Sequence, residues 1–405
     1  MSIQDRALIR RSNAIKDSEI PKYIEKLKRF LCHEALAKAQ ANLDKDLMHH
    51  GRCYRYWAHQ RRPWLFALRL YDRITNKGVH MPTEWPVPIR EMAGDAMMIS
   101  SLHHCMPDEV KAKYRQDLLT EQHNDFLVEI CTAWHYYLEG FDIQWYSLRH
   151  EKCPEFRVRG GGLDFDVECR RFSWDVSNHV KAAAMADVCD TIYKVLLARN
   201  LWGEVKVEFS EEFRFDPDRM SQWRKTLTDA LDASQTTVQL DGGVILTLGL
   251  KPSPSHKLTS AGLTELAREQ QHPEVSFLVS KSDGKSGFDP VAFRCRSPRK
   301  TPDELRDYVY KTLKDKVATQ LSPDRAGVAV VKFSAVRDPN VFAESEGMKH
   351  VITKLFSQRH LAAIVLRCED IAKTDMGSIL HSTPAIVFRN PETTFPCVAA
   401  VKHLS

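Results

Sequence analysis

Hydrophobic positions near the start of the chain follow the spacing of amphipathic helices. Ile24, Leu27 and Leu31 recur three or four residues apart with charged residues between them, which predicts helical structure over residues 17–47. Prolines then interrupt the pattern repeatedly. Because proline ends or kinks a helix, residues 51–110 are predicted to form short helices and turns.

The helical period is strongest over residues 117–140, where Phe126, Ile130 and Trp134 lie on one stripe. Beyond this segment the period of the pattern changes to two. Strands are therefore predicted over residues 142–149, 155–159 and 163–171. The glycines at 160–162, between the last two strands, suit a tight hairpin.

Helical and strand patterns alternate through the rest of the chain. Helices are predicted over residues 176–200, 217–233, 302–321 and 341–358. Strands are predicted over residues 205–209, 236–248, 275–279, 290–296, 327–333 and 362–367. Because hairpins and helical crossovers both occur, we expect an α/β fold with a mixed central sheet flanked by helices. A basic, mainly helical region over residues 1–110 is expected to precede an α/β domain over residues 111–405.

The net charge of +5 is unevenly distributed along the chain. Residues 1–75 hold 16 lysines and arginines against 8 aspartates and glutamates, which is a net charge of +8 and leaves −3 for the rest. A positive N-terminal region suits a polyanion such as nucleic acid, and a protein partner or a second copy of the chain could also bind there. A well-solvated helical surface accounts for the same charges.

The composition indicates a globular protein in the cytoplasm. No apolar run reaches the roughly 18–20 residues that cross a membrane, and charges break up the N-terminal apolar residues too early for a signal peptide. The ten cysteines are scattered singly, so reduced and mostly buried thiols are expected.

The strand predicted over residues 163–171 carries the most informative polar pattern. Side chains of a strand alternate between faces, so Glu168 and Arg170 share one face with Asp164 and Asp166. Cys169 lies on the other face and is expected to be buried. An ordinary half-solvated strand would show the same alternation, so the pattern acquires a functional meaning only together with its neighbours.

Three neighbouring motifs supply that meaning: Glu129 on the preceding helix, the step Pro154-Glu155 before a hairpin, and Glu168-Cys169-Arg170 on the strand. Together they resemble the PD-(D/E)xK restriction-endonuclease-like nuclease superfamily. The resemblance implies a metal-dependent nuclease that hydrolyses phosphodiester bonds of DNA or RNA, with Mg²⁺ as the cofactor and Mn²⁺ as a substitute. Defence against foreign DNA or DNA repair would be the corresponding biology.

The resemblance also implies roles for individual residues. Glu155, Glu168 and the backbone carbonyl of Cys169 would hold the metal, Glu129 would orient the attacking water, and Arg170 would contact the nucleophile or the scissile phosphate. Two identities depart from the pattern, because Glu155 replaces an aspartate and Arg170 replaces a lysine. An arginine binds phosphate but does not act as a base. The alternative is therefore an inactive nuclease-fold protein that binds nucleic acid or serves as a scaffold subunit.

Basic and polar residues elsewhere are candidates for contacts with nucleic acid. Thr301, Pro302 and the acids after them predict a well-capped helix start, and Lys316 and Gln320 lie one turn apart near its end. Members of the superfamily often direct such residues at the active site, although a lysine that extends into solvent would look the same. The remaining candidates are Arg171, Arg296, Arg299 and Lys300.

A zinc site is the rival metal-binding interpretation. Histidines and cysteines gather at Cys32-His33, at His49, His50 and Cys53, and at His103, His104 and Cys105. Their spacing lacks the paired CxxC motifs that are typical of structural zinc sites, so this interpretation has less support than the magnesium site.

Overall fold

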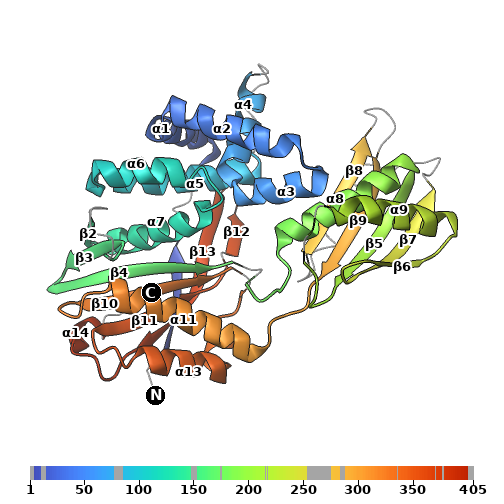
Figure 1. Cartoon of the computed structure of the whole chain (residues 1–405). Helices are drawn as coiled ribbons and strands as arrows, with labels where there is room; N and C mark the ends of the chain where they lie inside the picture. Colours follow the sequence, from blue (N-terminus) through green and yellow to red (C-terminus); the bar gives the residue numbers. More distant parts are fainter. Residues whose placement is uncertain are drawn as a thin grey trace. The chain divides into compact units, whose positions relative to one another are not determined.

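Helices and strands alternate along the chain, and the computed structural model confirms the α/β class (Figure 1). Within the part of the chain that is described, the strands form two mixed sheets, one of eight strands and one of five. The structure describes residues 4–10, 15–76, 85–146, 153–173, 176–214, 216, 218–252, 275–282, 288–334, 336–369, 371–375 and 378–399.

The chain divides into two compact units, and each contains one of the two sheets. The first unit comprises Met1–Ala41, Arg61–Val176 and Thr301–Ser405, and the second comprises Asn42–Gln60 and Ser177–Lys300. The units do not divide at residue 110, where the sequence placed its boundary. Residues on both sides of that position belong to the first unit, because α5 (Val87–Leu102) packs against α7 (His123–Leu138).

The sheet of the first unit has the strand order β1-β13-β11-β10-β4-β3-β2, with β12 paired to β13. Inside it, β4 is antiparallel to β3 and parallel to β10. Residues 326–331 of β10 are buried without interruption, as is typical of a strand covered on both faces. The strands are β1 (Gln4–Arg10), β2 (Asp142–Trp145), β3 (Phe156–Gly160), β4 (Leu163–Phe172), β10 (Ala326–Phe333), β11 (Leu361–Arg367), β12 (Ile371–Asp375) and β13 (Ser378–Arg389).

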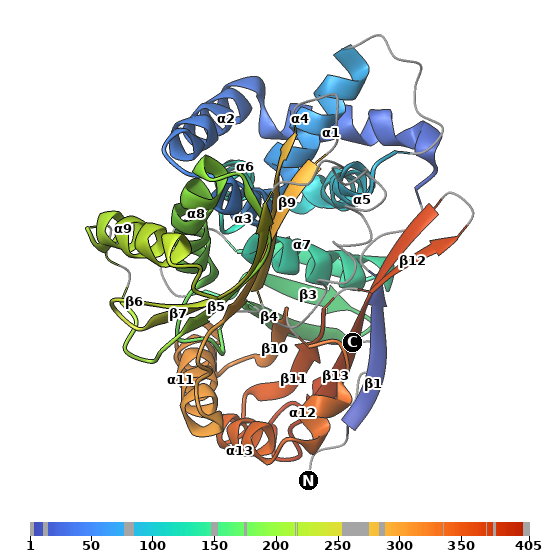
Figure 2. The same cartoon turned by 90° about the vertical axis from the view of Figure 1, so that its right-hand side faces the viewer.

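Helices cover both faces of this sheet (Figures 1 and 2). On one face α7 packs along β4, and α5 and α6 pack against the outer side of α7. On the other face, Val309, Leu313 and Val317 of α11 join the apolar core formed with α13 and the sheet. The helices of this unit are α1 (Ile20–Leu31), α4 (Pro63–Asn76), α5, α6 (Asp108–Asp117), α7, α11 (Pro302–Gln320), α12 (Asn340–Glu344), α13 (Glu346–Leu355) and α14 (Pro396–Ala399), with the 3-10 turns η1 (Asp17–Glu19) and η2 (His103–Cys105).

The second unit interrupts the first between β4 and α11, and its own sheet has the order β6-β7-β5-β9-β8. The sequence predicted one central sheet, whereas the strands between residues 201 and 296 form this separate one. Two carboxylate oxygens of Asp190 accept hydrogen bonds from the backbone N–H groups of Cys53 at 2.8 Å and Tyr54 at 3.0 Å, which joins the segment Asn42–Gln60 to this unit. Its strands are β5 (Leu201–Phe209), β6 (Thr237–Leu240), β7 (Val244–Pro252), β8 (Val275–Ser282) and β9 (Phe288–Arg296), and its helices are α3 (Arg52–Arg61), α8 (Ala182–Ala198) and α9 (Arg219–Asp232), while α2 (His33–Met48) begins in the first unit and ends in the second.

Two features that the sequence predicted from neighbouring residues, the glycine hairpin and the helix start at Thr301, are confirmed. The glycine hairpin joins β3 to β4, with Gly160 opposite Leu163 and positive φ angles at Gly161 and Gly162. The helix start at Thr301 carries a capping box, because the Thr301 hydroxyl accepts from Glu304 N at 3.2 Å while the Glu304 carboxylate accepts from Thr301 N at 2.7 Å.

Several predicted elements are divided in the structure. Residues 17–47 form two helices, α1 and α2, because Cys32 between them has a φ of 57°, which is outside the helical region. Residues 341–358 are likewise divided between α12 and α13 at Ser345. Its hydroxyl accepts from Met348 N at 3.2 Å and so caps a second helix.

The structure also contains more strands than the sequence predicted. The strand expected over residues 236–248 is the hairpin of β6 and β7, which turns at Gly242 and Gly243, both with a φ of 82°. The sequence did not predict β1, β12 or β13, which pair with one another at one edge of the larger sheet.

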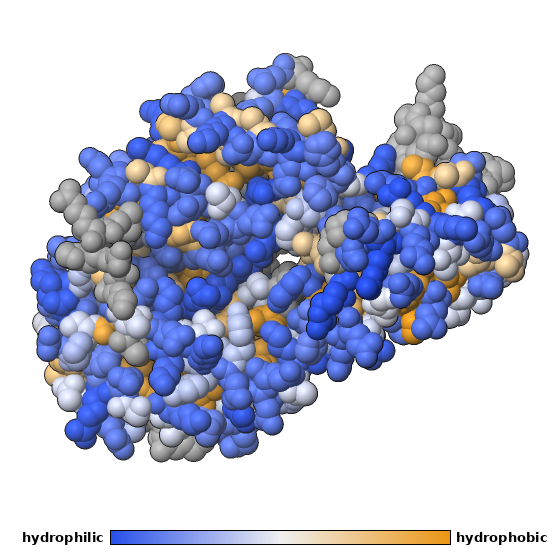
Figure 3. Space-filling model, in the orientation of Figure 1, coloured by the Kyte–Doolittle hydropathy of each residue, from blue (hydrophilic) through white to orange (hydrophobic). Residues whose placement is uncertain are grey.

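Polar residues dominate the face of each unit that is drawn in Figure 3, with hydrophobic residues scattered among them. Most of the cysteines are buried, as expected, including Cys169. Among the helices of the described residues, none combines the length and the apolar composition that crossing a bilayer requires.

The hairpin turn yields a test of backbone conformation. A Cβ at Gly161 would meet no atom within 4 Å, so any penalty for a side chain there comes from its φ of 58°. Gly161→Val should lower the free energy of unfolding by about 1–2 kcal/mol, whereas Gly161→Asn should cost much less, because asparagine tolerates this conformation. Urea unfolding measures both variants, and equal losses would contradict the backbone explanation.

Candidate active site

Two of the three acids of β4 lie inside the protein, whereas Asp164 at its start is exposed. Asp166 is 1% exposed and Glu168 is 2% exposed. The half-solvated strand considered from the sequence is therefore wrong, because α11 covers the face on which these acids lie. Buried carboxylates are costly unless they are paired or protonated, so their presence requires a physical explanation.

The alternation predicted for β4 is confirmed. Pairing with β10 continues without a register shift from Phe165 to Phe172, so side chains two residues apart share a face. Glu168 and Arg170 thus lie on the face toward α11, where Phe172 contacts the Tyr308 ring. Cys169, which is 6% exposed, lies on the opposite face.

Glu155 lies where β3 begins, and its position follows from a mismatch between two strands. The pairing of β3 with β4 ends at Phe156 and Val167, whereas β4 continues to Phe172. This leaves Cys169 N without a strand partner on that edge, and the Glu155 carboxylate accepts its hydrogen bond at 3.1 Å. Because the N–H and C=O of a strand residue point to the same edge, the Cys169 carbonyl is directed toward the same side.

Glu129 is held on α7 by residues of two other elements. The Tyr114 hydroxyl of α6 donates to Glu129 Oε2 at 2.5 Å, and Trp145 Nε1 of β2 donates to the Tyr114 oxygen at 3.1 Å. Burial raises the pKa of Glu129 well above its usual range, and the charge of Glu155 adds to this effect. The hydrogen bond from Tyr114 and the charge of Lys113 oppose it.

Lys316 of α11 lies beside the buried acid of β4. Its Nζ is 3.1 Å from Glu168 Oε1 and donates to Gln320 Oε1 at 3.0 Å. Burial raises the pKa of Glu168 well above its usual range, the charge of Glu155 raises it further, and Lys316 opposes both. The pair predicted from the helix pattern therefore lies next to the predicted acid.

The three glutamates form one electrostatic cluster, because the charge of Glu155 acts on both Glu129 and Glu168. We call Glu129, Glu155, Glu168 and Lys316 the acid cluster. Like charges at close range cannot all ionise without a cation, so such a cluster either retains protons or binds positive charge.

The donor set of the acid cluster fits a hard divalent cation. Among the described residues, Glu168 Oε1 is ion-paired with Lys316 Nζ at 3.1 Å, while Oε2 has no hydrogen-bond partner and remains available as an acceptor. Glu155 and the Cys169 carbonyl add further oxygen donors on the adjacent strand edge, and Mg²⁺ prefers such oxygens. Across the described ranges, no three His, Cys, Asp or Glu side chains form a complete metal-binding group, so the backbone carbonyl and water would have to complete the set.

No protein-family model matches the chain, and no curated protein has a significantly similar sequence.

The remaining predicted site residues lie in different surroundings. Arg170 is partly buried, and its Nε has no hydrogen-bond partner among the described residues. Arg171 lies on the opposite face of β4, where its guanidinium donates to Ser334 Oγ at 2.9 Å and to Asp125 Oδ1 at 3.2 Å. A structural role thus accounts for Arg171, whereas the buried Nε of Arg170 is left without a hydrogen bond.

The other basic candidates belong to the second unit. Arg296 is exposed and lies 4.0 Å from Glu208, and Arg299 forms an isolated bridge with Asn178. Lys300 N donates to Ser177 O at 2.8 Å. These residues are therefore not members of the acid cluster, which lies entirely within the first unit.

The rival zinc site is not assembled among the described residues. The Cys53 thiol instead lies with Cys189 and Cys295, whose sulfurs are 3.3 Å apart. Sequence reasoning also missed Tyr114, Trp145 and Lys113. The periodicity of residues 108–117 identifies Tyr114 as an apolar position of a helix, but its contact with Glu129 depends on tertiary packing.

The raised pKa of Glu129 predicts a pH dependence of stability. The folded protein retains a proton that the unfolded chain releases near pH 4.5, so the free energy of unfolding should fall as the pH rises from there through the folded pKa. Glu129→Gln removes this titration. Its stability relative to the wild type should therefore increase with pH, by at most about 1.4 kcal/mol per pH unit.

Urea unfolding in EDTA across this pH range measures the difference. Glu34→Gln, at an exposed position of α2, is the matched control and should follow the wild type. Parallel profiles for Glu129→Gln and the wild type would show that Glu129 titrates normally.

Proposed function

We propose that the protein is a divalent-metal-dependent nuclease that hydrolyses phosphodiester bonds of DNA or RNA. The observation that carries the proposal is the acid cluster, in which buried Glu168 lies 3.1 Å from Lys316 and within the electrostatic influence of Glu155. A protein gains no stability from burying an underneutralised carboxylate, so a functional reason for the arrangement is favoured.

The order of elements around the cluster supports the proposal. A helix, three antiparallel strands, a second helix and a parallel strand follow one another as α7, β2, β3, β4, α11 and β10. The first helix, α7, carries Glu129. Glu155 lies directly before the second strand, β3, and Glu168 lies on the third strand, β4. This is the arrangement that the resemblance to PD-(D/E)xK nucleases implies, with the second unit inserted before the second helix.

Glu155, Glu168 and the Cys169 carbonyl would hold the Mg²⁺ ion, and Mn²⁺ is the experimental substitute for it. When bound, the ion supplies Lewis-acid polarisation of the phosphate and eases deprotonation of water. Glu155 is longer than the aspartate of the family pattern by one methylene. Its carboxylate nevertheless reaches the edge of β4, as the 3.1 Å hydrogen bond from Cys169 N demonstrates.

Glu129 and Lys316 would act on the reacting groups directly. Hydrolysis forms a bond between a water oxygen and phosphorus, breaks the bond from phosphorus to the departing sugar oxygen, and moves a proton from the water to that oxygen. A carboxylate whose pKa is raised is a stronger base once it is ionised, so Glu129 is suited to receive the proton of the water when the positive charge of a bound ion has ionised it. Lys316 places positive charge where negative charge builds up on the phosphate.

Lys316 is also the residue that would replace the missing lysine of the family pattern. Arginine at position 170 remains charged and cannot transfer a proton, whereas a lysine amine can. Lys316 approaches Glu168 from α11 instead of from β4. In this proposal Lys316 has the catalytic role and Arg170 contacts phosphate. A cytoplasmic location and a role in defence or repair are in keeping with such an activity.

The test is cleavage of labelled DNA and RNA, single- and double-stranded, in Mg²⁺, in Mn²⁺ and in EDTA. The wild type should cut at least one substrate, and only with a divalent ion. Glu168→Gln should abolish cleavage because it removes a proposed ligand, and Lys316→Met should slow it about 100-fold or more. Arg170→Lys should preserve or raise the activity.

Lys311→Met is the control for Lys316→Met, because Lys311 is exposed on the same helix. Retained cleavage in Glu168→Gln would show that the active site lies elsewhere. If calorimetry detects no binding of Mn²⁺ and the wild type cuts none of the substrates, the protein is instead a binding or scaffold subunit with a nuclease-like fold.

A further inference from the structure

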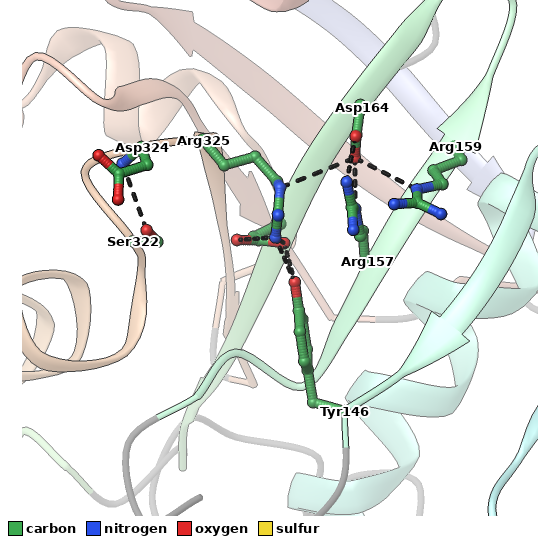
Figure 4. A network of polar contacts seen from close by, with 8 residues as sticks. Tyr146, Arg157, Arg159, Asp164, Ser322, Asp324 and Arg325 are labelled. Carbon is green, nitrogen blue, oxygen red and sulfur yellow. Dashed lines mark hydrogen bonds and ion pairs between the residues drawn. The ribbon is translucent and has the colours of Figure 1, made fainter.

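A second polar cluster adjoins the acid cluster on the same face of β4 (Figure 4). Its centre is buried Asp166, whose Oδ1 accepts from the Tyr146 hydroxyl at 2.5 Å and from Arg325 Nη1 at 3.1 Å. Arg325 Nη1 also contacts the Tyr146 oxygen at 2.6 Å. Three elements thereby hold one guanidinium in place: the end of β2, the middle of β4 and the turn before β10.

Two further arginines surround the same place at the β3–β4 hairpin. Arg157 Nε donates to Asp164 Oδ1 at 2.5 Å, and Arg159 Nε lies 3.7 Å from the same oxygen. Arg325 Nε is 3.9 Å from it. Three guanidiniums therefore share two carboxylates, and in Figure 4 the Asp324 carboxylate points away from them. One positive charge is left over.

Two of the three arginine side chains remain accessible, unlike Asp166 beneath them. The Arg159 side chain is 48% exposed and that of Arg325 is 30% exposed, whereas Asp166 is 2% exposed in its side chain. Arg325 Nη2 has no partner among the described residues, and a guanidinium can donate five hydrogen bonds in a planar fork that matches phosphate. Two arginines would suffice to neutralise Asp164 and Asp166, so the third points to an anionic ligand.

The spacing along β4 connects this cluster to the proposed active site. Asp166, Glu168 and Arg170 lie on one face at intervals of two residues, which is about 6.6 Å per step in a strand. Each position carries a cation, namely Arg325 at Asp166, Lys316 at Glu168 and the Arg170 side chain itself. The cation paired with Asp166 therefore lies one strand step along β4 from the acid cluster.

We propose that Arg325, with Arg157 and Arg159, holds a phosphate of a nucleic-acid strand, next to the phosphate that is cut. The inference rests on the proposed nuclease function for the identity of the ligand. The hydrogen bonds from Arg325 and Tyr146 to Asp166 orient the guanidinium before the ligand arrives, which reduces the entropy lost on binding. Contacts of this kind position a strand without reading its sequence.

The experiment measures binding of labelled single-stranded DNA to the full chain in EDTA, where no cleavage occurs. Arg325→Gln combined with Asp166→Asn removes both partners together, so that no buried charge is left unpaired. This double variant should bind about 10-fold more weakly, and the slope of log affinity against log salt should fall by about 0.7, the amount expected for one lost phosphate contact on a single strand.

Two further variants keep the test independent of folding. Arg159→Gln changes a largely exposed residue and should also weaken binding and reduce the slope. Arg337→Gln is the matched control, because Arg337 is an exposed arginine paired with Glu369 at 3.2 Å elsewhere in the first unit, and it should bind like the wild type. Thermal unfolding verifies that each variant is folded.

The outcomes separate this inference from the proposed catalysis. Unchanged affinity and slope in both the folded double variant and Arg159→Gln would overturn it, even if the wild type cleaves DNA. If the variants bind more weakly but the wild type never cleaves, the phosphate site is supported and the proposed nuclease activity is contradicted. Inorganic phosphate that displaces DNA completely at equimolar concentration would assign the site to a free anion. Tighter binding of an acidic peptide than of DNA, with the same loss in the variants, would assign it to a protein partner.

Discussion

Unequal pairing of β4 with its two neighbours determines the geometry of the candidate site. Pairing with β3 ends at Val167, whereas pairing with β10 continues to Phe172. The free edge that results is where Glu155 accepts from Cys169 N. The longer pairing with β10 fixes the end of α11 and therefore places Lys316 at Glu168. If β3 extended further, its backbone would take the hydrogen bond of Cys169, and no carboxylate could reach this edge.

The same geometry has a cost in stability. Burial disfavours ionisation of Glu129 and Glu168, and the charge of Glu155 strengthens the effect. Tyr114, Lys113 and Lys316 compensate only in part, since the pKa values of Glu129 and Glu168 remain raised. Residues that weaken the fold but converge with complementary groups are typical of functional sites. Arg171 is the contrast, because its pairing with Asp125 and Ser334 gives it a structural role.

Features encoded within a few residues were predictable from the sequence. The capping box at Thr301, the glycine hairpin and the alternation of Glu168 with Cys169 each depend on neighbours in the chain. The contact between Tyr114 and Glu129 was not predictable, because helical periodicity identifies a buried stripe and not the helix that covers it. The domain boundary predicted near residue 110 was wrong for the same reason. A change of pattern near residue 110 says nothing about the packing of α5 against α7.

The inserted unit explains why the site could be retained although its parts are distant in sequence. Ser177–Lys300 separates β4 from α11, yet the parallel ladder of β4 with β10 and the apolar contacts of Val309, Leu313 and Val317 hold α11 to the sheet. The entropy of closing a loop grows only logarithmically with its length, by about 0.6 kcal/mol for each doubling. A segment that folds on itself, with its own sheet, shortens the effective loop further. Proximity of Lys316 to Glu168 therefore depends on the ladder and the apolar face of α11, and an insertion between them leaves both intact.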